Sequence, residues 1–223
     1  LKQNASSETM GDGATRTTRR NDFRELIRYL SQNSSLLVVF LIAAILNLAL
    51  VGLTIGAPVI VAKHLGMQSS FVGIIEVAMG LGGLVGSGLV GIWPHRFSFK
   101  GICRYVAMIC FGVVPIIVTL LSGPDELAFA ALAAGSAWVM AWASIASVEI
   151  VSFVQRSAPK ELCGKVLALV YMTLSCATPI GQLVYGLAYD RWTPAIVFAG
   201  MLAVLTLTTA LFYRLKSRLW RMS

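Results

Sequence analysis

The stretch that decides the fold is FVGIIEVAMGLGGLVGSGLVGIW, residues 71–93, which is apolar except for Ser87 and one carboxylate, Glu76. A helix of this length is about 35 Å long, enough to cross a bilayer core of about 30 Å. Its many glycines would weaken a helix in water, but in lipid the backbone hydrogen bonds have no competitor. Gly82 and Gly86 also have the GxxxG spacing that lets helices approach closely. We therefore predict a membrane-spanning helix packed tightly against a neighbour.

The composition of the whole chain agrees with a membrane protein. Of its 223 residues, 57% are hydrophobic and 13% are charged, with a mean hydropathy of +0.78. A soluble domain carries about 25% charged residues, so a soluble core of this length could not hide so much apolar sequence. The net charge of +8 would by itself fit a nucleic-acid binder. The positions of the basic residues favour the lipid bilayer as partner instead, and we predict no nucleic-acid binding.

Five further apolar segments are comparable in length to the first. Together the six segments occupy residues 35–62, 70–93, 102–121, 127–154, 163–188 and 194–214. The connections between them are short, and the prolines within the segments are tolerated as kinks in lipid. We predict an all-α integral membrane protein in which residues 35–215 form a six-helix transmembrane domain.

The basic residues predict how the chain is oriented. All but two of the 18 Lys and Arg residues fall on one side of the six predicted spans, and the two exceptions are Lys63 and Arg191. Because loops rich in Lys and Arg stay in the cytoplasm, both termini are expected there. An even number of spans agrees. We expect a multi-pass protein of the cell membrane.

The segments outside the spans differ in character. Residues 1–21 are polar and are predicted to be a disordered cytoplasmic segment. Residues 22–34 have apolar positions at i, i+3, i+4 and i+7, which predicts an amphipathic juxtamembrane helix. That helix either lies on the membrane surface or extends the first span. Residues 216–223 are predicted to be a basic cytoplasmic tail.

Three stretches resemble a known family. The run NDFRELIRYLSQNSSLLVVFLIAAILN, residues 21–47, resembles a central loop leading into a seventh helix, and GSGLVGIWPHRFSFKG, residues 86–101, resembles a basic loop without its customary aspartate. The run at 154–190 has the order Pro159, Glu161, Gly164 and Lys165, followed by PIG and a later glycine. In this order and spacing, the chain resembles helices seven to twelve of a major facilitator superfamily transporter, of the enterobactin-exporter or macrolide-efflux type.

The resemblance implies one half of a twelve-helix bundle. The other half would be an N-terminal six-helix bundle, absent from this sequence, or a second copy of this chain. It further implies proton-coupled secondary efflux of a small molecule, such as a drug or siderophore, by alternating access around a site near the midplane. Two other hypotheses are a half-transporter remnant acting as a membrane interaction protein and, less favoured, an intramembrane enzyme.

Two deep acids are the candidate transport groups. Glu76 lies about 8 Å down its helix, where it either faces a water-filled cavity and binds a proton or cationic group, or is held by a polar partner. Glu149 lies near the cytoplasmic end of the fourth span, the cavity-lining helix ten by resemblance. Arg104 starts the third span at a similar depth. We expect either a gating charge pair between Arg104 and Glu149 or proton or substrate binding by Glu149.

Polar and aromatic residues add candidates for the cavity. Asn47, at the middle of the first span, and Gln182 suit either substrate hydrogen bonds or helix–helix hydrogen bonds. Trp138 and Trp142, four residues apart, could stack an aromatic substrate or simply pack. The glycines expected at helix contacts are Gly82, Gly86, Gly181 and Gly186.

Chemistry based on metals or catalysis is disfavoured. The two histidines, His64 and His95, stand at segment ends, and the four cysteines show no CxxC pair, so we predict inert thiols, no metal site and no cofactor. Ser87 lacks the first glycine of the GxSG motif of rhomboid proteases, so no catalytic residue is predicted.

Overall fold

The computed structural model describes residues 34–219, all in or between helices. The predicted disordered segment 1–21 and residues 22–33 of the predicted amphipathic helix lie outside the described residues, as do residues 220–223 of the predicted tail. The elements are α2 (Ser34–Val59), the π-helix η1 (Ile60–His64), α3 (Ser69–Ile92), the 3₁₀ turns η2 (Pro94–Arg96) and η3 (Phe99–Gly101), α4 (Ile102–Ser122), α5 (Asp125–Ser157), α6 (Lys160–Arg191) and α7 (Pro194–Leu219).

Six of these helices are long and apolar enough to span a membrane, which confirms the predicted six-span, all-α fold. Their bounds fall close to the predicted segments, although α5 and α6 extend further, to 33 and 32 residues. Both helices extend at both ends, and at the N-terminal ends the extra residues begin just after Pro124 and Pro159, which occupy the N-cap positions of α5 and α6. A proline before the first turn does not disturb a helix, because the first amide groups have no intrahelical partner. Charged terminal turns can then project beyond the hydrocarbon core.

The exit from α2 is the least regular part of the spans. Pro58 removes one backbone donor from the last turns, and the chain continues as the π-helix η1. The turn closes at Gly66, whose φ of 61° lies in the left-handed region that favours glycine. The chain thus reverses direction between α2 and α3 within only a few residues.

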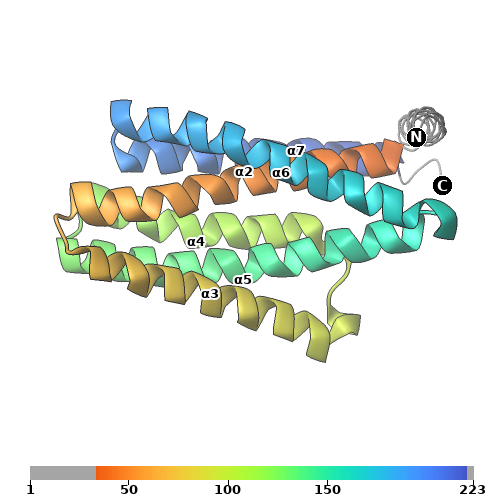
Figure 1. The fold of residues 1–223 in the computed structure, drawn as a ribbon, viewed down its shortest axis with the longest axis horizontal. Helices are drawn as coiled ribbons and strands as arrows, with labels where there is room; N and C mark the ends of the chain where they lie inside the picture. The colour runs from red at the N-terminus through yellow and green to blue at the C-terminus, as the bar shows by residue number, and fades with distance from the viewer. Residues whose placement is uncertain (1–33, 220–223) are drawn as a thin grey trace, which may run out of the picture.

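The helices run alternately up and down, so the connections gather at two ends of the bundle (Figure 1). We call the end with the α3–α4 and α5–α6 connections the basic end, since it carries Arg96, Arg104, Arg156, Lys160 and Lys165. The opposite end, with the α2–α3, α4–α5 and α6–α7 connections, is the distal end.

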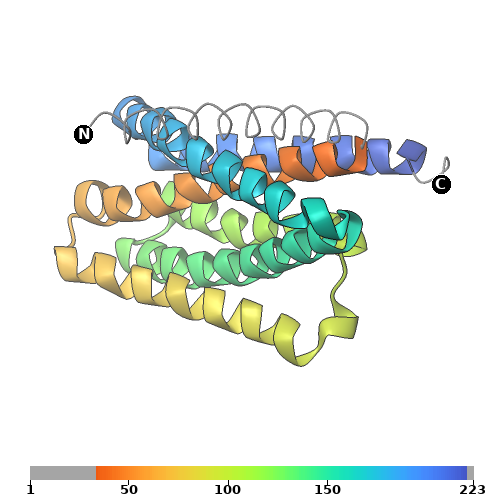
Figure 2. The ribbon, with the colours of Figure 1, turned by 45° about the vertical axis from the view of Figure 1, so that its right-hand side comes forward.

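The packing pattern repeats between the first three helices and the last three. Helix α3 packs on α5, just as α6 packs on α2, and α4 packs on α5 as α7 packs on α2. The contacts between α4 and α7 and between α2 and α5 join the two sets. In Figures 1 and 2, α3 lies along one edge of the bundle and α6 and α7 lie along the other. The six spans therefore form two interleaved three-helix units, in which α2 and α5 are central.

The contact between α3 and α5 is made backbone to backbone. A Cβ added at Gly82 or Gly86 would meet the carbonyl groups of Ala137 or Ala141, which are themselves four residues apart on α5. Both glycines are buried. The GxxxG face noticed in the sequence thus lies on a matching small-residue face of the neighbouring helix.

A second GxxxG face, which the sequence analysis missed, joins α2 to α6. Gly52 and Gly56 leave room for the rings of Tyr185 and Tyr189, and the Tyr189 hydroxyl donates a 3.0 Å hydrogen bond to the Gly52 carbonyl. Here the glycines accept aromatic side chains instead of a second backbone. The spacing of four on both helices is a signal that could have been read from the sequence.

Candidate functional site

A pocket opens between α2, α5 and α6, the two central helices and one edge helix. Its walls are mostly aliphatic, and its cavity volume is about 70 Å³. Three uncharged polar side chains line it, namely Asn47, Ser147 and Tyr171. Asn47 lies midway along α2, and Ser147 lies towards the basic end of α5. We call this the central pocket.

Asn47 is held in place by α6. Its side-chain amide donates to the Leu174 carbonyl at 3.1 Å and to the Thr178 hydroxyl at 3.2 Å. The helix–helix hydrogen bond that the sequence allowed is therefore present. Both donors of the amide are engaged, so Asn47 can offer an incoming molecule only its carbonyl oxygen.

Glu149 is buried behind the central pocket, on another face of α5. It follows Trp142 by seven residues, and Trp142 stacks on Tyr105 of α4, so Glu149 is directed towards α4. One turn further on, Phe153 stacks on Phe99. The side chain is only 6% exposed, and its Oε2 has no hydrogen-bond partner. A buried carboxylate oxygen that accepts no hydrogen bond is costly, which makes the site notable.

The predicted pair between Arg104 and Glu149 is not formed. Glu149 Oε2 instead lies 3.7 Å from the Arg156 guanidinium, whose side chain is 67% exposed. Arg104 is exposed, with its Cζ 5.8 Å from the Tyr105 ring centre. The reason is helical geometry: Tyr105 points inward, so its predecessor is turned away, whereas Arg156 follows Glu149 by two full turns on the same face.

The two tryptophans are not among the residues that line the central pocket, and their contacts match the packing role, one of the two that the sequence allowed. Trp138 donates its indole N–H to the Met108 carbonyl at 2.9 Å and covers Gly112, and Trp142 stacks on Tyr105. Both rings therefore pack against α4. The pocket is lined instead by the α5 residues at 143, 147, 150 and 151, which lie on a different face of the helix.

The predicted site residues on α6 also differ in their surroundings. Gly181 is covered by Leu48 and Val51 of α2, as expected of a packing glycine. Gly186 is different, because a Cβ added there would meet nothing within 4 Å. Gln182 is exposed on α6 and is not among the residues that line the central pocket. The expected helix contact at Gly186 is therefore absent in the described part of the chain.

Glu76 is exposed on α3, beside the buried Ile75. With Gly80, Gly83 and Ser87 it follows a spacing of three to four residues, so these four positions share one side of α3. Gly83 lies close to the Ser144 hydroxyl, and Ser144 is three residues before Ser147 on α5. A small and polar strip on α3 thus borders the same side of α5 that opens into the central pocket.

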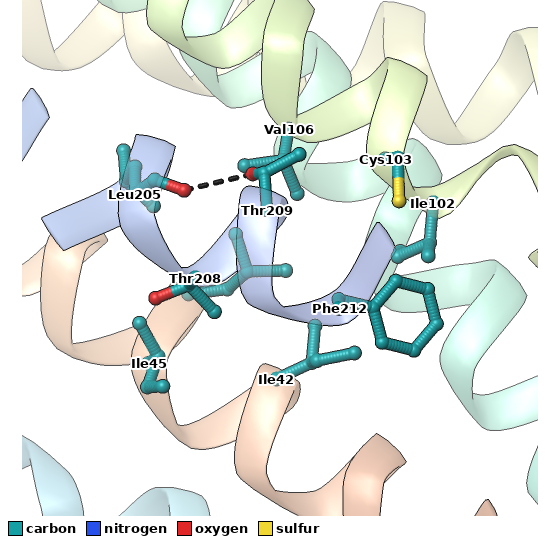
Figure 3. A pocket seen from close by; sticks show the side chains of 10 residues that line it. Ile42, Ile45, Ile102, Cys103, Val106, Leu205, Thr208, Thr209 and Phe212 are labelled. Atoms are coloured by element: carbon teal, nitrogen blue, oxygen red, sulfur yellow. Dashed lines mark hydrogen bonds between the residues drawn. The ribbon is translucent and has the colours of Figure 1, made fainter. Parts of the chain in front are cut away.

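A smaller pocket lies between α2, α4 and α7, towards the basic end (Figure 3). Its polar groups are already engaged, since Thr208 and Thr209 each donate a 2.7 Å hydrogen bond to a carbonyl of their own helix. The remaining walls are mainly aliphatic side chains and Phe212. This pocket offers an incoming molecule little beyond apolar contact.

The described residues contain neither a cluster of metal ligands nor a serine arranged for catalysis. Among residues 34–219, no three His, Cys, Asp or Glu side chains lie together as metal ligands would. The Ser87 hydroxyl donates to the Gly83 and Leu84 carbonyls of its own helix, at 2.9 and 3.2 Å. That bonding is the usual one for a serine within a span.

The fold and the pocket between its central helices define a polytopic α-helical membrane protein. The model of the family described as transmembrane secretion effector, within the major facilitator superfamily, matches residues 8–223. The chain belongs to this family, which is one of transporters, so its role is in membrane transport. No curated protein matches the chain.

Proposed function

We propose that this chain forms half of a proton-coupled exporter of the cell membrane, with its basic end on the cytoplasmic side. The observation that carries the coupling is Glu149, a buried carboxylate whose Oε2 accepts no hydrogen bond and whose ion-pair partner, Arg156, reaches solvent. The central pocket on the neighbouring face of α5 would hold the exported molecule. Proton binding at Glu149 and substrate binding in the central pocket would then both affect α5.

The lining of the central pocket favours an uncharged, mostly apolar substrate. Its polar groups are an amide, a hydroxyl and a phenol, and no charged side chain lines it. An anionic siderophore would lose its hydration there without gaining a cation, which is unfavourable. Of the two classes implied by resemblance, a neutral drug-like molecule therefore fits better than a siderophore.

The proton would be exchanged at Glu149 through Arg156. When the guanidinium lies beside Oε2, the carboxylate is stabilised as an anion; when it moves into solvent, a proton from the cytoplasmic side replaces it. Rocking of the two halves would change the packing of α5, which carries Glu149 and lines the central pocket, and so couple protonation of Glu149 to access at that pocket.

A second six-helix bundle would complete the transporter. Helices α3 and α6 are the least covered of the spans, because only 17% of the most apolar stretch of each is buried inside the described part of the chain. Helix α6 lines the central pocket, and α3 packs on α5, which also lines it. We propose that they contact an N-terminal half, or a second copy of this chain, across the transport path.

Transport in proteoliposomes tests the coupling. We expect radiolabelled chloramphenicol, a neutral and mostly apolar drug, to move against its gradient when a pH gradient is imposed on the chain reconstituted with a partner half. Glu149→Gln is expected to abolish this uphill movement but to leave chloramphenicol exchange across the membrane without a gradient, because the pocket itself is unchanged.

Two controls sharpen the result. Asn47→Ala is expected to reduce both uphill movement and exchange, since it alters the pocket. Uphill transport that persists in Glu149→Gln would contradict the assignment of the proton to Glu149. An absence of exchange with every partner half, in a correctly folded protein, would favour a membrane interaction protein without transport activity.

A further inference from the structure

An apolar groove, separate from the central pocket, lies between α2, α6 and α7 near the distal end. Its cavity volume is about 380 Å³, against about 70 Å³ for the central pocket. Residues that shape it include Val184 and Tyr185 of α6, Trp192 directly after α6, and Val197, Gly200 and Met201 of α7. We call it the distal groove. Tyr185 and Trp192 contribute the polar atoms of an otherwise aliphatic lining, so water gains little by entering it.

The depth of the groove corresponds to one leaflet of a bilayer. On α7 it extends from Ile196, in the first turn of the helix, to Val204, a rise of about 12 Å. Half of a typical hydrocarbon core is about 15 Å thick. A hydrocarbon chain that enters at the distal interface would therefore lie along the groove over most of its length.

An arginine suited to a phosphate directly precedes a residue of the groove lining. Trp192, which lines the groove, directly follows Arg191, the last residue of α6. The neighbouring Asp190 is paired with Lys63 at 3.2 Å. Arg191 is exposed and has no ion-pair partner among residues 34–219. An arginine beside an interfacial tryptophan is suited to a lipid headgroup.

We propose that the distal groove is a phospholipid site. One acyl chain of a lipid from the leaflet at the distal end lies between α6 and α7, and its phosphate is bound by Arg191. Such a lipid differs from ordinary boundary lipid, because an acyl chain inside the groove contacts three helices instead of one. This assignment does not depend on transport.

Gly200 provides the test, since it lines the groove and a Cβ added there would meet nothing within 4 Å. Gly200→Leu should fill the groove without disturbing helix packing. The matched control is Gly186→Leu, at a similar depth on α6, also in open space and outside the groove lining. Both variants are first checked for unchanged elution on size exclusion.

The full chain is reconstituted in nanodiscs of phosphatidylglycerol that carry a diazirine on the acyl chain, irradiated and digested with trypsin. We expect stronger labelling of the α7 peptide 192–214 than of the α3 peptide 64–96, which presents an open apolar face. Gly200→Leu should lower the ratio of these labels several-fold, and Gly186→Leu should leave it unchanged. Equal labelling of both peptides, or a ratio unaffected by Gly200→Leu, would show boundary lipid only.

The headgroup is tested separately by native mass spectrometry after detergent extraction. Arg191→Gln should reduce retained phosphatidylglycerol several-fold, and Arg96→Gln, at the basic end, should not. Retention that is the same in both variants would overturn the role of Arg191. Displacement of the lipid by chloramphenicol, with loss of acyl labelling, would instead mark the groove as a substrate site and overturn the proposal.

Discussion

At the scale of single residues, the balance between burial and pairing at Glu149 is the central feature. Its partner Arg156 is mostly in water, so the attraction is screened, and the 3.7 Å separation is longer than a charge-assisted hydrogen bond. The carboxylate therefore remains poorly compensated. This is a reason to expect function at Glu149, since such a group lowers the stability of the protein that retains it.

The first prediction concerns the stability of this pair. Arg156→Gln leaves Glu149 buried without a cation and should lower the unfolding free energy by about 2 kcal/mol, between the values for exposed and fully buried pairs. Glu149→Gln removes the buried charge itself and should cost less. Thermal unfolding in detergent measures both, and the double variant should be more stable than Arg156→Gln alone.

The opposite order of stability would contradict this account. If Glu149→Gln unfolds at a lower temperature than Arg156→Gln, the carboxylate makes stabilising contacts beyond its ion pair. Lys160→Gln serves as a control, because it also removes one cation from the basic end without being paired to Glu149.

At the scale of elements, two GxxxG faces set the distances between helices. On α3 the glycines admit the backbone of α5, and on α2 they admit the two tyrosine rings of α6. The other glycines of α3 are not equivalent, because a Cβ at Gly80 or Gly88 would meet nothing within 4 Å. A high glycine content alone therefore does not say which helix face is packed.

Substitution of these glycines by alanine tests the distinction. Gly86→Ala should lower the unfolding free energy by about 1–3 kcal/mol, the usual cost of overpacking, because its Cβ would meet the Ala141 carbonyl. Gly88→Ala, on the same helix, should be neutral or slightly stabilising, since alanine favours the helix. Equal effects of the two variants on thermal unfolding would show that α3 and α5 are not in this close contact.

At the scale of the whole molecule, the uneven coverage of the spans indicates which side the transport path lies on. Helix α6 lines the central pocket and α3 packs on α5, and Glu76 lies on the polar strip of α3 near the distal end. In the proposed orientation this position faces outward. Water from outside should reach it along the path between the two halves.

Labelling of an introduced thiol tests both the orientation and the path. In a chain whose four cysteines are replaced by serine, Glu76→Cys should react with a membrane-impermeant maleimide added to intact cells. Val77→Cys, at the same depth on an apolar exposed face, should react several-fold more slowly because lipid covers it. Faster labelling at Val77→Cys, or labelling only after the cells are opened, would contradict the proposed arrangement.

Much of the architecture was predictable from the sequence. The number of spans and their approximate bounds follow from hydropathy, which is a property of local composition and needs no partner. The GxxxG face of residues 82–86 was predictable for a similar reason, because close packing requires small residues at that spacing. The major facilitator superfamily was recognised from the order of its loop motifs, and the match over residues 8–223 confirms the superfamily but not the enterobactin-exporter or macrolide-efflux type.

The tertiary structure alone decided which side chains meet. One residue along a helix changes direction by about 100°, so Arg104 was turned away from Glu149 while Arg156 shared its face. For the same reason, Trp138 and Trp142 pack on α4 whereas Ser147 opens into the central pocket. Hydropathy records how apolar a segment is, but the faces it presents depend on helix rotation, and rotation is set by packing with neighbours distant in the chain.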